Sequence, residues 1–449
     1  MSSSSPLERR IANQLGASPG RRIGLAATTG AVAKGFSLVA QVVAVAIAVR
    51  ALGADGFALF VIIASLVSWI SFAGLGVAPG LTLGIARAAA VEDRIEEARL
   101  FLTSLLLMGA VAAVLIGGAL LLGSTGGLER LLSGWIGAES GDASTAFLLM
   151  AVLIAVQLVV VVPEAAQLGL QTQYVSNIWA GVGAAAAIIA MVAAGHAITT
   201  VTAFILISQG PQVAARAANG VLFVLGRQYL LRPAGLRFRH VRPILGSGLA
   251  FAGFQVASYL GLQVGLLIMA ATVNAASVAL AGVIVRGLTL QSAGMGLITT
   301  PTWPAIANAL MRRDLPWIRR THRLLEFGVL GYSSLVALVI LVGLEGLIGI
   351  WTGTRPADNL AVRVFVAIYV VVTGFAHVNA MTLVGMGDLR FTATVLVAEA
   401  VLVVALQAVF VPMTGVTGYV GALAVGAVVL SGWILALRVR LELRNEVAA

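Results

Sequence analysis

The chain has 449 residues, of which 60% are hydrophobic and only 10% are charged, and its mean hydropathy is +1.02. This composition excludes a soluble globular protein, and the lack of cysteine excludes disulfides, thiolate metal sites and cysteine catalysis. The net charge of +10 requires no nucleic-acid partner, because basic loops of a membrane protein face the anionic lipids of the cytoplasmic leaflet.

Twelve apolar stretches follow one another along the chain and are separated by short connections. A bilayer core about 30 Å thick requires roughly 20 apolar residues in a helix, and each stretch reaches this length. The predicted spans are residues 24–49, 57–84, 99–122, 143–166, 174–195, 198–226, 245–272, 275–299, 322–350, 361–385, 391–411 and 416–437. We therefore expect an all-α, polytopic membrane protein of about twelve transmembrane helices.

The arginines predict the orientation of these spans. Twenty-one of them lie in the two terminal tails and after the second, sixth, eighth and tenth spans, whereas the opposite loops carry only Arg50, Arg130, Arg355 and Arg363. Because loops rich in Lys and Arg stay in the cytoplasm, both termini are predicted to be cytoplasmic. The localisation we expect is a bacterial inner membrane.

The widest basic loop lies almost at the midpoint of the chain and suggests two lobes of six helices. The two halves share a weak pattern at an offset of about 221 residues, as in Ala58-Leu59 and Ala279-Leu280. Paired six-helix lobes occur in transporters that rock around a central site, so we expect two pseudo-symmetric lobes around a central cavity. The predicted parts are a tail (1–23), an N-terminal lobe (24–226), a linker (227–244), a C-terminal lobe (245–437) and a second tail (438–449).

Three basic residues, Lys34, Arg216 and Arg286, lie inside predicted spans and away from the span ends. A charge at the centre of a bilayer costs several kcal/mol, so each cation should face a partner or a water-filled cavity. Arg216 shares a helix face with Gln212 and Asn219, because these residues recur at spacings of three and four. Lys34 also has a second interpretation, since a lysine near a helix end can extend its ammonium group to the interface.

Other polar residues in the spans leave alternatives open. Glu164 and Glu399 can pair with the buried cations and lock the bundle, or take part in ion coupling, and Glu164 can also be an interfacial carboxylate. His377 is either a proton-sensitive group or a hydrogen-bonded interior histidine. In the seventh span, Gln255, Tyr259 and Gln263 recur at intervals of four residues and form a polar face. We expect neither a metal site nor a cofactor.

Three segments carry motifs whose order and spacing can be compared with known membrane proteins. The first, residues 50–76, reads RALGADGFALFVIIASLVSWISFAGLG, with a leucine-glycine turn, a Gly-aromatic pair and a glycine-rich corner. The second, residues 302–320, reads TWPAIANALMRRDLPWIRR, and the third combines VGMGDLRF at 384–391 with VPMTGVTGYVG at 411–421. These segments resemble bacterial polysaccharide flippases of the multidrug/oligosaccharidyl-lipid/polysaccharide exporter superfamily. The resemblance implies a non-enzymatic transporter that exports lipid-linked oligosaccharides by alternating access.

The predicted cargo is a polyprenyl-diphosphate-linked oligosaccharide, flipped to the outer leaflet for surface polysaccharide biosynthesis. The predicted substrate-binding residues are Arg216, Arg286, Lys34, Gln212, Asn219, Gln255, Tyr259 and Gln263. Guanidinium groups match phosphate oxygens in two-point contacts, and the amides and the phenol can bond sugar hydroxyls. The other partners are the bilayer and a coupling proton or sodium ion, and a bundle of this size can work as a monomer.

Two other functions remain as alternatives. A multidrug extruder of the same superfamily would be expected to carry carboxylates in its first, seventh or eighth helix, and the corresponding spans contain no Asp or Glu. A membrane polymerase or ligase would generally need a large external loop with catalytic side chains, whereas the longest external connections have only about 20 residues. The flippase is therefore the first prediction.

Overall fold

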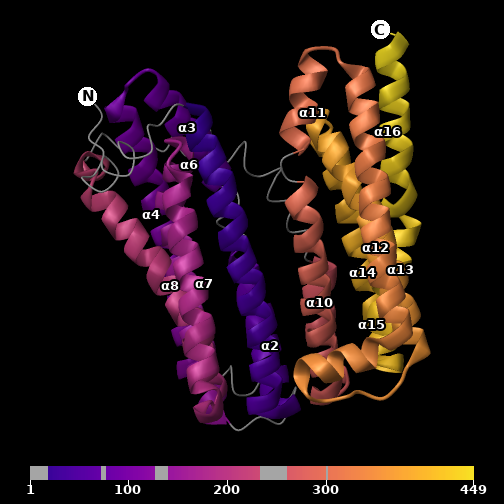
Figure 1. Cartoon of the computed structure of the whole chain (residues 1–449). Coiled ribbons are helices and arrows are strands. Elements are labelled where there is room, and N and C mark those ends of the chain that lie inside the picture. Colours follow the sequence, from indigo (N-terminus) through magenta and orange to yellow (C-terminus); the bar gives the residue numbers. More distant parts are fainter. Residues whose placement is uncertain (1–18, 72–76, 127–139, 233–259, 300–301, 449) are drawn as a thin grey trace. The chain divides into compact units, whose positions relative to one another are not determined.

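The computed structural model describes residues 19–71, 77–126, 140–232, 260–299 and 302–448, and within these ranges the chain is helical and contains no strand. The all-α fold class predicted from the sequence is confirmed. The chain forms two compact units, Met1–Ala252 and Gly253–Ala449. Each unit is built from long helices, which Figure 1 labels in chain order.

The N-terminal unit contains the helices that carry Lys34, Glu164 and Arg216. They are α2 (Pro19–Ser71), α3 (Val77–Ala90), α4 (Arg94–Ser124), α6 (Ser140–Gly169), α7 (Gln173–Ala194) and α8 (Val201–Leu225), with short 3-10 turns at Gly195–Ala197 and Gln228–Leu231. The first predicted span and the start of the second lie in α2, which breaks at Gly53 (φ 68°, ψ −172°). Glycine reaches this positive φ without a steric penalty, so the predicted leucine-glycine turn is where the helix breaks.

Within this unit, α7 packs against both α2 and α8, and α6 packs against α3, α4 and α8. The crossing of α7 and α8 is close at Gly183, where an added Cβ would lie 2.9 Å from the Cα of Gln212 and 3.0 Å from the Cβ of Ala215. Small residues allow two helix backbones to approach in this way when the bilayer gives no hydrophobic drive for association. The crossing therefore fixes the position of the polar face of α8.

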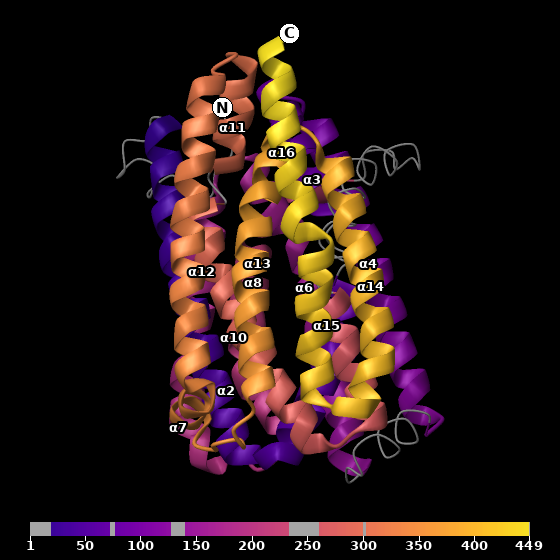
Figure 2. The same ribbon diagram turned by 90° about the vertical axis from the view of Figure 1, so that its right-hand side faces the viewer.

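The C-terminal unit begins, among its described residues, with a helix at Leu260–Thr272. It continues with α10 (Ala275–Thr299), α11 (Thr302–Met311), α12 (Leu315–Thr352), α13 (Leu360–Gly385), α14 (Leu389–Thr414), α15 (Val416–Val429) and α16 (Ser431–Ala448). The side chains of Asp314 and Asn359 accept hydrogen bonds from the first turns of α12 and α13 and fix where these helices begin. Helix α13 lies between α12 and the α15–α16 pair, as Figure 2 shows.

The observed helices agree with most of the predicted spans to within a few residues. The described part of the chain contains nine helices that are long and apolar enough to cross a membrane. Helix α8 is not among them, because it carries glutamines, an arginine and an asparagine between residues 209 and 219. Residues 72–76 of the second span and 245–259 of the seventh lie outside the described residues, as does most of the predicted linker.

Candidate functional site

The polar face of α8 is positioned from the first turn of the helix. The side chain of Thr200 accepts a hydrogen bond from the backbone N–H of Ala203. The carboxylate of Asp142, in α6, accepts from the backbone N–H groups of Val201 (2.7 Å) and Thr202 (3.2 Å). These bonds satisfy N–H groups that lack a partner within a helix, and Asp142 also ties the start of α8 to α6. The bonds from Asp142 therefore set the register between α6 and α8.

Further along the same two helices, Arg216 and Glu164 form a two-point ion pair. The Nε of Arg216 lies 2.9 Å from Oε1 of Glu164, and its Nη2 lies 3.1 Å from Oε2. The pair is not sealed off, because 36% of the Arg216 side chain and 19% of the Glu164 side chain are exposed. A half-exposed charge is costly against hydrocarbon, so this edge of the unit is the one suited to water.

Three residues beyond the ion pair on each helix, Gln167 and Asn219 bond each other through both amide groups. Gln167 Nε2 donates to Asn219 Oδ1 (3.0 Å), and Asn219 Nδ2 donates to Gln167 Oε1 (3.1 Å). Both residues are only 1% exposed. Asn219 is therefore held inside the bundle in this structure, and its predicted contact with a sugar is not available in this arrangement.

The amide pair gives a prediction about stability. Asn219→Leu should lower the free energy of unfolding by about 1–3 kcal/mol, because it leaves the buried amide of Gln167 without its partner. The double variant Gln167→Leu/Asn219→Leu should recover much of this loss, since no buried polar group is then left unpaired. Thermal unfolding of the purified protein in detergent measures both. Equal losses in the single and the double variant would contradict this assignment.

Lys34 lies half-buried in α2, on the same helix face as Ser37 and Gln41. Among the described residues, no carboxylate lies within ion-pair distance of its ammonium group. The Oε1 atom of Gln41 is buried and has no hydrogen-bond partner in the described part of the chain. On this face of α2, therefore, some polar groups have no hydrogen-bond or ion-pair partner on the described neighbouring helices.

Contacts through α7 show that Lys34 and Arg216 lie at similar depth in the N-terminal unit. An added Cβ at Gly181 would lie 3.6 Å from the Cα of Ala33, and one at Gly183 would lie 2.9 Å from the Cα of Gln212. Positions 181 and 183 are about 3 Å apart along the helix axis. The level of Lys34 on α2 is thus close to the level of Gln212 on α8, one turn before Arg216. The structure brings these two cations into one layer.

The remaining predicted binding residues are placed as follows. The Nε2 of Gln212 donates to the carbonyl of Ser208, one turn earlier in α8. Arg286, in α10, and Gln263 are half-buried in the C-terminal unit, and each interacts with neighbouring groups. Gln255 and Tyr259 lie outside the described residues. The structure therefore groups Lys34, Gln212 and Arg216 and places Arg286 and Gln263 in the other unit.

Three residues are also candidates for a role in ion coupling: Glu164, Glu399 and His377. Their surroundings differ. Glu164 is paired with Arg216. Glu399, in α14, is largely buried, and its Oε2 atom has no hydrogen-bond partner among the described residues. The Nε2 of His377 lies 2.8 Å from the hydroxyl oxygen of Thr299. His377 thus has the surroundings of the second interpretation, a hydrogen-bonded interior histidine.

Sequence reasoning missed several polar groups that the structure brings together. Gln167 was missed although it follows Glu164 by one helical turn, and this spacing was the available signal. The cap from Asp142 to α8 joins residues 59 and 60 positions apart, and no local pattern predicts it. At the end of α8, the hydroxyl of Tyr229 donates to Glu97 of α4. Burial and this hydrogen bond raise the pKa of Tyr229 above its ordinary value.

Comparisons with known proteins identify the fold. No family model and no curated protein matches the chain. Among solved structures, it is similar to an inward-facing multidrug resistance MATE family transporter of the MOP superfamily, with a TM-score of 0.77, 14% identity, and coverage of 94% of this chain and 99% of that one. An outward-facing transporter of the same description gives a TM-score of 0.65 at 15% identity, with 97% and 98% covered.

A third similar structure is a MOP superfamily transporter from Pyrococcus furiosus, described as having a binding pocket of reversed polarity that suggests a different function. It gives a TM-score of 0.64 at 12% identity, with 96% of this chain and 97% of that chain covered. At these identities the likeness establishes the fold, which in MATE transporters has twelve transmembrane helices in two lobes. The predicted polytopic, two-lobed fold class is therefore confirmed.

Proposed function

We propose that the chain is a membrane transporter that moves a polyprenyl-diphosphate-linked oligosaccharide from the cytoplasmic to the outer leaflet by alternating access. The fold shared with MATE family transporters supports transport as the general activity. The anionic cargo is supported by one observation above all, the layer in the N-terminal unit where Lys34 and Arg216 lie at similar depth. Arg286 is the predicted cationic binding residue of the C-terminal unit.

The ion pair between Arg216 and Glu164 suggests how this layer would handle an anion. A guanidinium group binds a carboxylate or a phosphate through the same pair of parallel hydrogen bonds. A diphosphate that enters the layer can therefore replace Glu164 as the partner of Arg216, while Lys34 adds a second positive charge. Because 36% of the Arg216 side chain is exposed, a phosphate could approach the guanidinium group from the open side before Glu164 is released.

Release of Glu164 would couple this exchange to a cation. A carboxylate that loses its partner within a membrane-spanning unit is costly unless another positive charge neutralises it. A proton on Glu164 would do so while the phosphate holds Arg216, and its loss would restore the ion pair once the cargo leaves. Glu164 thus becomes the candidate coupling residue of the N-terminal unit.

The cargo is tested directly in liposomes that contain the purified protein. A fluorescent undecaprenyl-diphosphate oligosaccharide should equilibrate between leaflets at least tenfold faster with the protein than without it. The control is an undecaprenyl oligosaccharide that lacks the diphosphate, and it should show little acceleration because the cationic layer has no anion to bind. Equal acceleration of both lipids, or of neither, would contradict the proposal.

Extrusion of cationic drugs is the second candidate, because two of the similar structures are described as multidrug resistance transporters. The charges argue against it, since Lys34 would repel a cation, Glu164 is already paired with Arg216, and the first, second, seventh and eighth predicted spans contain no carboxylate. Proton-driven uptake of ethidium into the same liposomes separates the two functions. Ethidium transport without lipid flipping would favour the extruder.

A further inference from the structure

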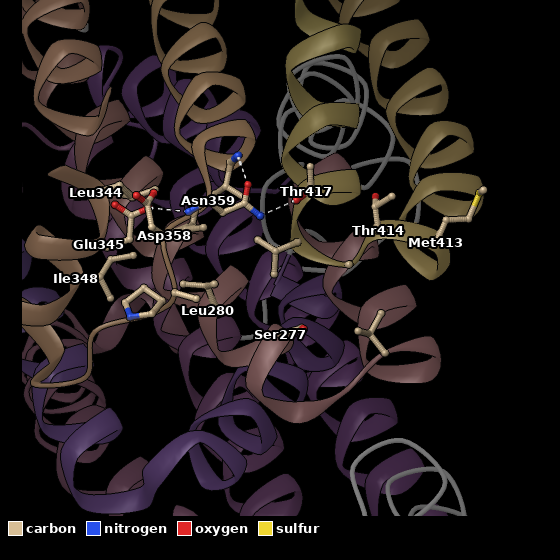
Figure 3. Close-up of a pocket in the computed structure, with 17 residues that line it drawn as sticks. Ser277, Leu280, Leu344, Glu345, Ile348, Asp358, Asn359, Met413, Thr414 and Thr417 are labelled. Carbon is tan, nitrogen blue, oxygen red and sulfur yellow. Dashed lines mark hydrogen bonds between the residues drawn. The ribbon is translucent and has the colours of Figure 1, made fainter. Parts of the chain in front are cut away.

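The C-terminal unit contains a polar pocket whose lining includes none of the residues predicted to bind substrate. It is a cavity of about 500 Å³ at the end of the unit where α12 and α14 finish and α10, α13 and α15 begin (Figure 3). The predicted topology places this end of the unit on the external side of the membrane. The volume lies within the range of roughly 300–1,000 Å³ that is typical of small-molecule sites.

A break in α12 shapes one wall of this pocket. Gly343 leaves helical geometry (φ −160°, ψ 40°), and the last turns of α12 then carry Glu345 and Ile348 to the pocket. The carbonyl of Leu341, next to the break, accepts a hydrogen bond from Nη1 of Arg363 (3.2 Å). The same arginine donates through Nε to Glu345 (3.1 Å), so the wall is held by a side chain of α13.

Asn359 joins three helices at the centre of the pocket, as Figure 3 shows. Its backbone N–H donates to Oε1 of Glu345 in α12 (3.3 Å), and its Nδ2 donates to the hydroxyl of Thr417 in α15 (3.1 Å). Its Oδ1 accepts from the backbone N–H of Val362 and caps α13. The polar lining is therefore ordered before any ligand arrives, which reduces the entropy lost on binding.

The charges in the pocket do not favour a metal ion or another cation. Glu345 is only 5% exposed, and Arg363 and Asn359 already bond its carboxylate. Asp358 also pairs with Arg363, and 72% of its side chain is open to solvent. One guanidinium thus offsets one of the two negative charges, and the remaining charge lies mainly at Asp358, where solvent screens it.

What remains for a ligand is a mixture of neutral polar groups and apolar surface. Ser277 presents a hydroxyl that no other described residue bonds, and Thr417 retains its own proton to donate. Beside these groups, Leu280, Ile284 and Ile348 supply an apolar floor, and Leu280 and Ile284 share a face of α10 with Ser277. A sugar ring has a matching distribution, with C–H groups on its faces and hydroxyls at its edges.

We propose that this pocket binds a sugar ring and serves as an external subsite for a glycan. The inference deepens the proposed function, since such a subsite would receive the glycan of a flipped lipid on the outer side. Its chemistry is nevertheless independent of transport, because the pocket needs only a neutral polyhydroxylated ligand. Ser277, Thr417 and Asp358 would bond hydroxyls while the apolar floor contacts a face of the ring.

The test is saturation-transfer NMR on the purified full-length protein with the methyl glycosides of glucose, galactose, mannose and N-acetylglucosamine. At least one should bind with a Kd in the millimolar range. Ser277→Phe, which fills the cavity from α10, should raise that Kd at least tenfold. Ala276→Phe is the matched control, because the neighbouring residue is exposed and does not line the pocket. It should leave the Kd unchanged.

Two further measurements complete the design. Asp358→Asn should change the sugar Kd only a few-fold, because an amide also bonds hydroxyls, and tetramethylammonium should not compete with the sugar. The double variant Arg216→Ala/Glu164→Gln should bind sugar like wild type even where it no longer transports, which separates this subsite from the proposed function. Absence of sugar binding, equal losses in the two phenylalanine variants, or competition by tetramethylammonium would each overturn the proposal.

Discussion

Replacing Arg216 with alanine should reduce transport of the lipid-linked oligosaccharide by about 10- to 100-fold. A hydrogen bond to a charged group contributes about 1.5–3 kcal/mol, and every 1.4 kcal/mol is roughly a factor of ten in affinity or rate. The transport rate that falls should be that of the diphosphate-linked lipid, since the guanidinium group offers a two-point contact that no neutral side chain reproduces. The liposome flipping assay measures the rate.

The same substitution has a structural effect that must be separated from the loss of cargo binding. Arg216→Ala leaves Glu164 without its cation, and we expect a fall of about 1–3 kcal/mol in the free energy of unfolding. The fall should be at the lower end, because 36% of the Arg216 side chain is exposed and solvent screens the pair.

The double variant Arg216→Ala/Glu164→Gln separates the two effects. It removes both charges, so thermal stability should return towards that of wild type, whereas transport should stay low because the cation is still absent. Glu164→Gln alone should keep the guanidinium available but lose the proposed proton coupling, so transport should no longer respond to a pH gradient. Recovery of transport in the double variant would show that Arg216 only neutralises Glu164 and does not contact cargo.

The fold could be predicted largely from the sequence because a bilayer imposes a simple rule. Runs of about 20 apolar residues must form helices, since hydrocarbon offers no partners for backbone polar groups. The helices α7 (Gln173–Ala194) and α13 (Leu360–Gly385) accordingly begin and end within one residue of the predicted spans. The break of α12 at Gly343 was not predicted, and the contact found there is distant in sequence: Arg363 bonds the carbonyl of Leu341 from another helix.

The candidate site could be predicted only in part. Helical spacing placed Gln212, Arg216 and Asn219 on one face of α8, but spacing does not say what each side chain meets. Arg216 meets Glu164 and Asn219 meets Gln167 through contacts 52 residues apart, which depend on how α6 and α8 pack. The pocket of the C-terminal unit was missed for the same reason, since α10, α12, α13, α14 and α15 each contribute only a few of its residues.

Replacing Gly183 with alanine should destabilise the N-terminal unit by about 1–3 kcal/mol, the usual effect of adding a methyl group to a packed interface. The new Cβ would lie 2.9 Å from the Cα of Gln212, and a backbone atom cannot turn aside as a flexible side chain can. The helix α8 must shift, and with it the layer that contains Arg216. Transport should therefore fall together with thermal stability.

Gly181→Ala is the matched control, two residues earlier on the same helix. Its Cβ would lie 3.6 Å from the Cα of Ala33, an ordinary contact, so the substitution should be neutral or should stabilise the helix by about 0.5–1 kcal/mol. Adding Ala215→Gly to the Gly183→Ala variant removes one of the two close contacts and should restore part of the lost stability. Shifts of the same sign and size at positions 181 and 183 would mean that the α7–α8 crossing does not fix the polar layer.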